Sequence, residues 1–197
     1  SPGYKYDKTG QDACVRNLYA YGEGSEIIGV NVTGYLFADA NNLTISHCYL
    51  NDVIGYKTSY ENENCKIHSC FIIGGVQGEG EDNTDAWELS NNIFAEGFIA
   101  NLDNAVINHN TFVASNPDFC MVNVTNSGVM NNIIFHKRVN PLYQCTGNTY
   151  TKNVFSKDQK LDNNKWNETL EKIIACTGEP SQEAYYQTGN NSVAYHY

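Results

Sequence analysis

The chain is short of proline, of positive charge and of long apolar runs. Its 197 residues include 4 prolines, and 12 Lys and Arg stand against 22 Asp and Glu, for a formal net charge of -10. Nucleic acids and anionic membranes need clustered basic residues, so neither is predicted as a partner. No apolar run approaches the roughly 18 residues that cross a bilayer, so no membrane span is predicted.

Cysteine-pair motifs and targeting signals are lacking as well. The seven cysteines form no CxxC pair, and a chain of this length does not need disulfides to complete its core, so we predict buried free thiols. Cys48 and Cys70 keep a disulfide open as an alternative, because they fall one repeat apart. The N-terminal SPGYKYDKTG has no leader pattern, so an exported chain would have lost its leader before Ser1.

Asparagine, glycine and tyrosine are abundant instead, with 27, 16 and 14 residues, a composition that favours short strands joined by turns. The asparagines belong to a repeat whose successive starts differ by 18 to 23 residues. Its seven copies are SEIIGVNV (25–32), LTISHCYL (43–50), CKIHSCFI (65–72), WELSNNIF (87–94), AVINHNTF (105–112), GVMNNIIF (128–135) and NTYTKNVF (148–155).

Three positions of the repeat form columns. The third and eighth positions are apolar in every copy, and the sixth mixes asparagine with small apolar residues. The third position reads Ile27, Ile45, Ile67, Leu89, Ile107, Met130, Tyr150. The sixth reads Val30, Cys48, Cys70, Asn92, Asn110, Ile133, Asn153. The eighth reads Val32, Leu50, Ile72, Phe94, Phe112, Phe135, Phe155.

An odd separation between two inward positions requires a bend between them, because side chains alternate along a strand. We place the bend at the sixth position, where asparagine tolerates a left-handed backbone and its amide can bind the equivalent asparagine one layer away. Third strands are expected in GYLFA (34–38), VIGYK (53–57), GFIA (97–100), CMVNV (120–124) and PLYQC (141–145). A leucine-rich repeat has a similar period but needs several spaced leucines, which are missing.

Repeats of this size bury their apolar face only by stacking, so the chain is predicted to be all-β, a single-domain parallel β-helix of about seven coils. Residues 25–160 form the coils, and residues 1–24 form an N-terminal cap or a partial coil around Val15 to Tyr21. Residues 161–197 form the C-terminal helix and tail. The spacing of Trp166, Leu170, Ile173 and Ile174 predicts a capping helix within 163–180.

The repeated pattern apolar-x-x-Asn-x-Phe, over residues 25–155, resembles the right-handed parallel β-helix superfamily of pectate lyases, polygalacturonases and bacterial surface proteins. The resemblance implies a secreted or cell-surface protein whose partner is a polysaccharide or a cell-surface glycan. In that family a Lys or Arg base with Ca²⁺, or paired aspartates, carries the catalysis. No segment of this chain matches those signatures, so no catalytic set is transferred.

The candidate site residues lie in two neighbouring segments. Lys57 and Tyr60 would suit recognition of a uronic acid, and Lys57 is the candidate base of a lyase. Glu79, Glu81, Asp82 and Asp85 form a glycine-rich acidic loop, of which Glu79, Asp82 and Asp85 are candidate substrate-binding residues. A solvated loop without a cofactor is favoured there, and Ca²⁺ is the ion that its oxygen ligands would suit.

The sequence therefore predicts a β-helix protein that binds, and in a sharper variant cleaves, a polysaccharide. Whether it is a polysaccharide lyase, a glycoside hydrolase or no enzyme stays open. The alternative is a structural or adhesive module, such as a surface adhesin or a phage-fibre type trimer, whereas a monomer is favoured for sugar binding. Trp87 is expected in the core, and the histidines are expected to face solvent separately from one another.

Overall fold

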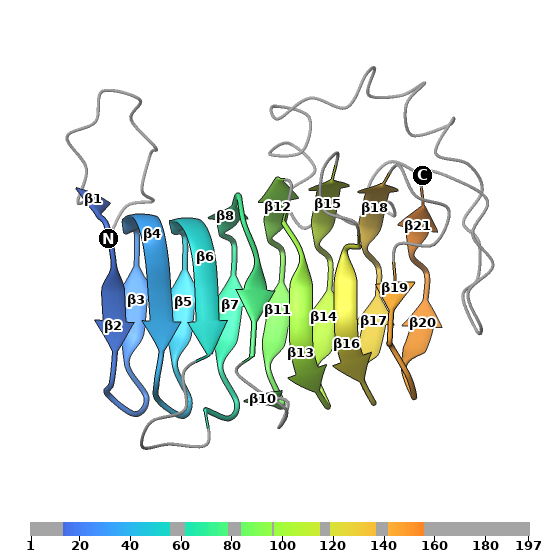
Figure 1. The fold of residues 1–197 in the computed structure, drawn as a ribbon, viewed down its shortest axis with the longest axis horizontal. Coiled ribbons are helices and arrows are strands. Elements are labelled where there is room, and N and C mark those ends of the chain that lie inside the picture. The colour runs from blue at the N-terminus through green and yellow to red at the C-terminus, as the bar shows by residue number, and fades with distance from the viewer. Residues whose placement is uncertain are drawn as a thin grey trace.

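A computed structural model describes residues 14–55, 62–78, 84–95, 97–114, 119–136 and 142–155. These ranges contain β-strands and turns, and no helix occurs among them. The predicted capping helix of residues 163–180 lies outside them. In Figure 1 the strands stand side by side along the molecule, from β2 at the N-terminal end to β20 and β21 at the other. The fold is a parallel β-solenoid, as predicted.

Each coil has three strand positions, separated by two bends. The first strands form a seven-stranded parallel sheet in which every neighbour is the equivalent strand of the next coil. They are β3 (Glu26–Ile28), β5 (Thr44–Ser46), β7 (Lys66–His68), β11 (Glu88–Ser90), β14 (Val106–Asn108), β17 (Gly128–Met130) and β20 (Thr149–Thr151).

The second and third strands share a 14-stranded sheet, because β4 (Asn31–Ala38) and β6 (Tyr49–Gly55) run through the bend between them. The remaining second strands are β1 (Cys14–Val15), β8 (Phe71–Ile72), β12 (Ile93–Ala95), β15 (Thr111–Ala114), β18 (Ile133–His136) and β21 (Val154–Phe155). The remaining third strands are β2 (Leu18–Ala20), β9 (Val76–Gln77), β10 (Thr84–Asp85), β13 (Ile99–Asp103), β16 (Met121–Thr125) and β19 (Leu142–Tyr143). Strands β1 and β2 form the partial coil expected around Val15 to Tyr21.

The solenoid has about five turns, fewer than the seven coils predicted. Seven first strands are stacked, one for each sequence repeat, but β3 and β20 end the stack and have a neighbour on one side only. The number of sequence repeats therefore exceeds the number of turns that have a neighbouring coil on both sides. The end coils bury less: the inward side chains of Val15, Leu18, Ile27 and Val30 are only partly buried.

The predicted columns are confirmed in six repeats, and the sixth repeat is out of register by one residue. Val129, rather than Met130, pairs with Ile107 and Tyr150, and Ile134, rather than Phe135, pairs with Phe112. A slip of one residue turns each side chain to the opposite face of a strand. Phe135 accordingly packs outside the main core, against Ile133 and Val154.

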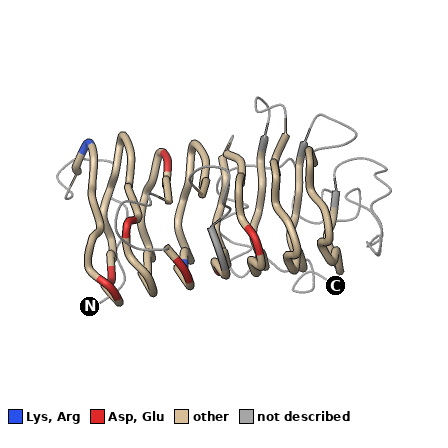
Figure 2. The backbone as a smooth tube through the Cα atoms, turned by 60° about the horizontal axis from the view of Figure 1, so that its bottom comes forward, with Lys and Arg blue, Asp and Glu red and all other residues tan. Residues whose placement is uncertain are grey.

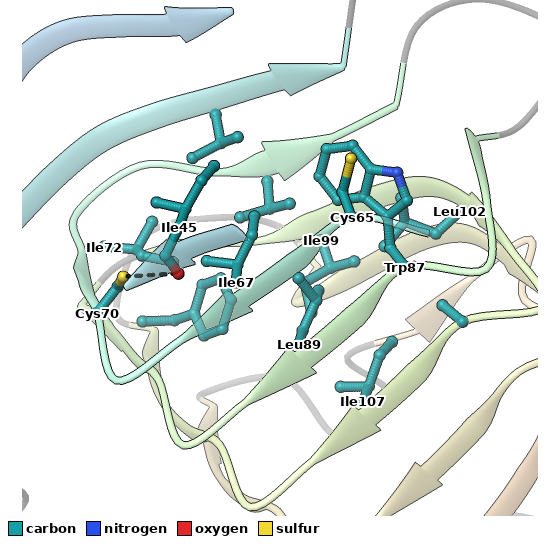
Figure 3. Close-up of a cluster of buried hydrophobic side chains, with 14 of the residues drawn as sticks. Ile45, Cys65, Ile67, Cys70, Ile72, Trp87, Leu89, Ile99, Leu102 and Ile107 are labelled. Atoms are coloured by element: carbon teal, nitrogen blue, oxygen red, sulfur yellow. Dashed lines mark hydrogen bonds between the residues drawn. The ribbon is translucent and has the colours of Figure 1, made fainter. Parts of the chain in front are cut away.

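The interior is a continuous apolar column. Ile45, Ile67, Leu89 and Ile107 are fully buried in successive coils, with further side chains from the other two strand positions around them (Figure 3). The rings of Phe94 and Phe112 stack at 4.6 Å between centroids. Trp87 is fully buried, as predicted, and its indole N–H donates to the carbonyl of Asn62 at 2.8 Å.

Two columns of left-handed residues turn the chain at the ends of each first strand. The predicted bend residue is off by one, because the left-handed residue is the fifth of the repeat and not the sixth. The column before the first strands contains Gly24, Asn42, Asn64, Ala86, Asn104, Asn126 and Gly147. The column after them contains Gly29, His47, Ser69, Asn91, His109, Asn131 and Lys152, with φ between 52° and 68°.

The sixth position instead holds a hydrogen-bonded ladder, as its asparagines predicted. Asn110 Oδ1 accepts the backbone N–H of Asn92 at 3.0 Å, and Asn110 Nδ2 donates to the carbonyl of Leu89 at 2.8 Å. Asn132 and Asn153 repeat this arrangement. Toward the N-terminus thiols take over, since Cys70 Sγ accepts the N–H of Cys48 at 3.5 Å. The ladder satisfies backbone groups that the bend removes from the sheets.

Candidate functional site

The sequence-predicted site falls largely outside the described residues. Lys57, Tyr60, Glu79, Glu81 and Asp82 all lie in the undescribed segments, and of Asp85 only the backbone is described. That backbone belongs to β10, where Asp85 pairs with Asp103 of β13. Whether these six residues gather at one place stays a prediction.

A different candidate emerges on the outward face of the third strands, where one register column crosses seven strands. Each of its residues pairs with the next, and the neighbouring column, from Leu36 through Val53 to Met121, points into the core. We call this set the outer column: Tyr19, Phe37, Ile54, Gln77, Ala100, Val122 and Tyr143. Strands β2, β4, β6, β13 and β16 present this face toward the viewer in Figure 1.

Aromatic rings gather at the N-terminal end of the outer column. Tyr19 stacks on Phe37 at 4.6 Å with an interplanar angle of 14°, and lies parallel to Tyr21 at 6.0 Å and 6°. Tyr35 completes the group, 5.7 Å from Phe37. The exposed fractions are 50% for Tyr19, 55% for Tyr21 and 45% for Tyr35. We call these four residues the tyrosine cluster.

A second aromatic group ends the outer column on the other side. Tyr143 is 48% exposed and stacks on Phe119 at 4.9 Å. Tyr19 and Tyr143 are six interstrand steps apart, about 29 Å at the usual spacing of about 4.8 Å. Among the residues that the structure describes, every large aromatic side chain counted as exposed lies on this one face.

The middle of this face has no aromatic side chain in the outer column and combines apolar residues with amides. Ala100 is nearly buried, and Gln77 beside it is half-buried. The half-buried Asn101 and Asn123 follow Ala100 and Val122 in sequence, and Asn123 Nδ2 donates to Asn101 Oδ1 at 3.1 Å. The outer column thus has aromatic rings at its ends and Ile54, Gln77, Ala100 and Val122 at its centre, with the amides of Asn101 and Asn123 beside it.

The other two outward faces are less suited to a ligand. On the second strands, Thr111, Ile133 and Val154 are buried although they point away from the core. On the first strands, Lys66 and Glu88 pair at 3.8 Å. Next to this pair the rings of His47 and His68 meet edge to face at 6.0 Å, which corrects the expectation of separate histidines. Burial, and then the neighbouring His47, lower the pKa of His68.

Four of the six described cysteines, Cys48, Cys65, Cys70 and Cys120, are buried as predicted, whereas Cys145 is half-buried and Cys14 is exposed. All six described cysteines are free, so no disulfide joins Cys48 to Cys70. A hydrogen bond from the Cys70 thiol lowers the pKa of Cys48 to about 7, whereas burial raises the pKa of Cys70. No group of three or more His, Cys, Asp or Glu side chains suited to a metal ion occurs within the described ranges.

Sequence reasoning missed the tyrosine cluster because it concentrated on charged residues. The signal was present as two period-2 patterns, Leu-Tyr-Ala-Tyr (18–21) and Tyr-Leu-Phe (35–37), in which aromatic residues alternate with inward residues. Placing these two segments in the same register would have brought Tyr19 next to Phe37. The pattern is weak because the two segments differ at most other positions.

The fold and this site define the class of protein: a parallel β-solenoid with two exposed aromatic groups on one face. No described helix has the length and apolar character needed to cross a membrane. Comparison with protein-family models, with curated protein sequences and with solved structures finds no match.

Proposed function

We propose that the chain is a secreted or cell-surface protein that binds a polysaccharide along the outer column. The observation that carries the proposal is the placement of Tyr19, Tyr21, Tyr35 and Tyr143 on one face, each about half exposed. An exposed tyrosine offers an apolar ring together with a hydroxyl group, so it contacts both the C–H groups and the hydroxyls of a sugar.

The shape of the outer column supports a linear polymer over a small sugar. A monosaccharide would occupy one aromatic group, whereas the outer column holds two groups separated by about 29 Å, if the usual strand spacing applies throughout. The amides of Gln77, Asn101 and Asn123 lie between them and offer hydrogen bonds to sugar hydroxyls. Repeat proteins present extended surfaces of this kind because equivalent positions recur at a constant pitch.

The likeness of the repeat to pectate lyase-type β-helices supports a carbohydrate ligand and a bacterial origin as parts of the same proposal.

Cleavage of the polysaccharide is not part of this proposal. The described face has no pair of carboxylates or free base to which we assign a catalytic role, so the proposal is binding. Lyase activity would depend on Lys57, and release of an unsaturated, ultraviolet-absorbing product from a polyuronate, lost in Lys57→Ala, would establish it.

Affinity electrophoresis through gels containing soluble polysaccharides tests the proposal. We expect at least one polymer to retard the protein, and Tyr19→Ala to weaken the retardation about tenfold, the equivalent of about 1.4 kcal/mol. Ile28→Ala is the matched control, because Ile28 is 56% exposed but lies on a first strand. Circular dichroism shows whether each variant keeps its fold.

Two outcomes would contradict sugar binding on this face. One is a protein that no polymer retards; the other is a loss of retardation that is equal in Tyr19→Ala and Ile28→Ala. A stable trimer by light scattering, together with the first of these outcomes, would favour the structural or adhesive module instead.

A further inference from the structure

The third strands carry charge of one sign only. None of the seven that contribute to the outer column contains Lys, Arg or His, whereas β6 contributes Asp52 and β13 contributes Asp103. Arg16, between β1 and β2, is the single basic residue next to these strands in the described part of the chain. Figure 2 likewise shows more acidic than basic positions along the described backbone.

Both aspartates are held by the protein's own donors. Asp52 accepts the backbone N–H of Gly75 and the side-chain amide of Asn51, each at 2.7 Å. Asp103 accepts the hydroxyl of Thr125 at 2.5 Å and the amide of Asn126 at 2.8 Å. These bonds hold the two acidic side chains in place on the third strands.

Recognition of an acidic sugar needs the opposite arrangement. Carboxylates are bound by Arg and Lys, most strongly through paired N–H donors, and like charges across an interface oppose binding. The described lysines do not supply positive charge on this face: Lys66 pairs with Glu88 on the first strands, and Lys152 lies at the bend after β20. Aromatic rings and amides, by contrast, suit uncharged hydroxyl-rich ligands.

We infer that the polysaccharide is neutral and lies along the outer column with both aromatic groups engaged. This inference rests on the proposed function and adds the chemical class and the direction of the ligand. It also departs from the uronic acid that Lys57 suggested from the sequence. A neutral ligand binds through stacking and hydrogen bonds, so its affinity depends little on salt, whereas binding through ion pairs weakens as salt screens the charges.

The test compares two sets of polymers in affinity gels at 50 and 500 mM NaCl, with and without 2 mM CaCl₂. The neutral set is a mixed-linkage β-glucan, a xylan and a galactomannan; the acidic set is polygalacturonate and alginate. We expect retardation by a neutral polymer to change by less than about twofold between the two salt concentrations, and no retardation by either polyuronate.

Variants separate the anchoring groups. Tyr19→Ala and Tyr143→Ala should each weaken binding to the neutral polymer about tenfold, and the double variant about a hundredfold, because the two rings lie too far apart to interact directly. Ile28→Ala, on a first strand, should leave binding unchanged. Retention of full affinity in Tyr143→Ala would overturn the predicted direction of the ligand.

The outcomes distinguish this inference from the proposal on which it rests. If no polymer of either set retards the protein, the proposed function itself fails. If a polyuronate retards it as strongly as the neutral polymers, or more strongly, the binding function stands and the neutral class is wrong. Loss of polyuronate binding in Lys57→Ala would then assign the acidic ligand to Lys57.

Discussion

At the residue scale, most of the described thiols pack as interior side chains. Cys65 is fully buried, and its thiol donates to the carbonyl of Ala40 at 3.2 Å. Cys70 takes the place of an asparagine in the ladder and accepts one backbone N–H, but a thiol is a weaker acceptor than an amide oxygen. The N-terminal coils therefore close their bends with weaker bonds than the C-terminal coils.

Burial of Cys65 predicts a loss of stability in alkali. Its pKa rises from 9.0 to about 11 in the folded chain, mainly because burial disfavours the thiolate. The stabilisation is fully present below pH 9, where the unfolded thiol is still protonated, and is lost as pH rises from about 9 through about 11. Two pKa units correspond to roughly 2–3 kcal/mol in the free energy of unfolding.

Urea unfolding under reducing conditions at pH 8, 9 and 10.5 measures this effect. Cys65→Ala should make the free energy of unfolding fall less steeply with pH. Part of the fall should remain in this variant, because burial also raises the pKa values of Cys70, Cys120, Cys145 and Tyr150. Cys14→Ala is the control, because Cys14 is exposed. Equal slopes for Cys65→Ala and the unmodified protein would show that Cys65 is not responsible.

Individual residues also show why one repeat was misplaced. Segment 128–135 contains two adjacent asparagines followed by three apolar residues, so its apolar pattern fits the columns in two registers. Burial decides between them: Asn132 joins the ladder through Asn110 and Asn153, whereas Ile133 points outward. Hydrogen bonding of a buried amide, more than apolar periodicity, sets the register there.

At the element scale, the asparagine ladder joins the bends of neighbouring coils, whose backbone groups lie outside the β-sheets. Substitution of Asn110 by alanine removes the acceptor for the N–H of Asn92 and the donor to the carbonyl of Leu89, both in the buried bend. We expect the free energy of unfolding to fall by about 2–4 kcal/mol, because at least two backbone groups lose their bonds. Urea unfolding monitored by circular dichroism measures the change.

Asn108 offers a matched control for this substitution. It lies two residues earlier in the same coil, on the outward side of β14, and its side-chain oxygen accepts no hydrogen bond. Asn108→Ala should change the free energy of unfolding by about 0.5 kcal/mol or less. If both substitutions cost the same, the ladder contributes nothing beyond a general preference for asparagine.

Strand positions were predictable from the sequence, and the bends only in part. Apolar columns recur because each coil must bury the same face, so all seven first strands fall within the predicted repeats. The left-handed bend was predicted one residue late because asparagine suits two adjacent positions of the repeat. It suits the left-handed backbone of the fifth position and the hydrogen-bonded ladder of the sixth. Ser69 and Lys152 occupy the left-handed position although neither is a typical residue for it, whereas histidine, as at His47, is enriched there.

At the scale of the whole molecule, stability depends on how many neighbours a coil has. Ile67 lies between two coils and is fully buried, whereas Ile27 lies in the end coil and is only partly buried. Ile67→Ala should lower the free energy of unfolding by about 2–5 kcal/mol, and Ile27→Ala by about 1 kcal/mol, since a partly buried side chain loses less contact.

Chemical unfolding of both variants under the same conditions provides the comparison. The two positions are equivalent in the repeat, so the difference isolates the effect of neighbouring coils. Similar losses would mean that the end of the column is as well enclosed as its interior.

The candidate site was less predictable than the fold for a reason that also belongs to the whole molecule. Tyr19 and Tyr143 are 124 positions apart in the sequence, yet they belong to one column. Only the register of every intervening third strand relates them, and the third strands vary most in length between repeats. Without that register the sequence indicates only local clusters of charge, such as Lys57 and the acidic loop.

The two left-handed columns have a consequence for how such a molecule changes in length. Every coil enters its first strand after one left-handed residue and leaves it through another, so each coil begins and ends in the same backbone geometry. A whole coil inserted or deleted at these points would leave the geometry of the remaining coils intact. The distance between Tyr19 and Tyr143 would then change in steps of one strand spacing, about 4.8 Å for each coil.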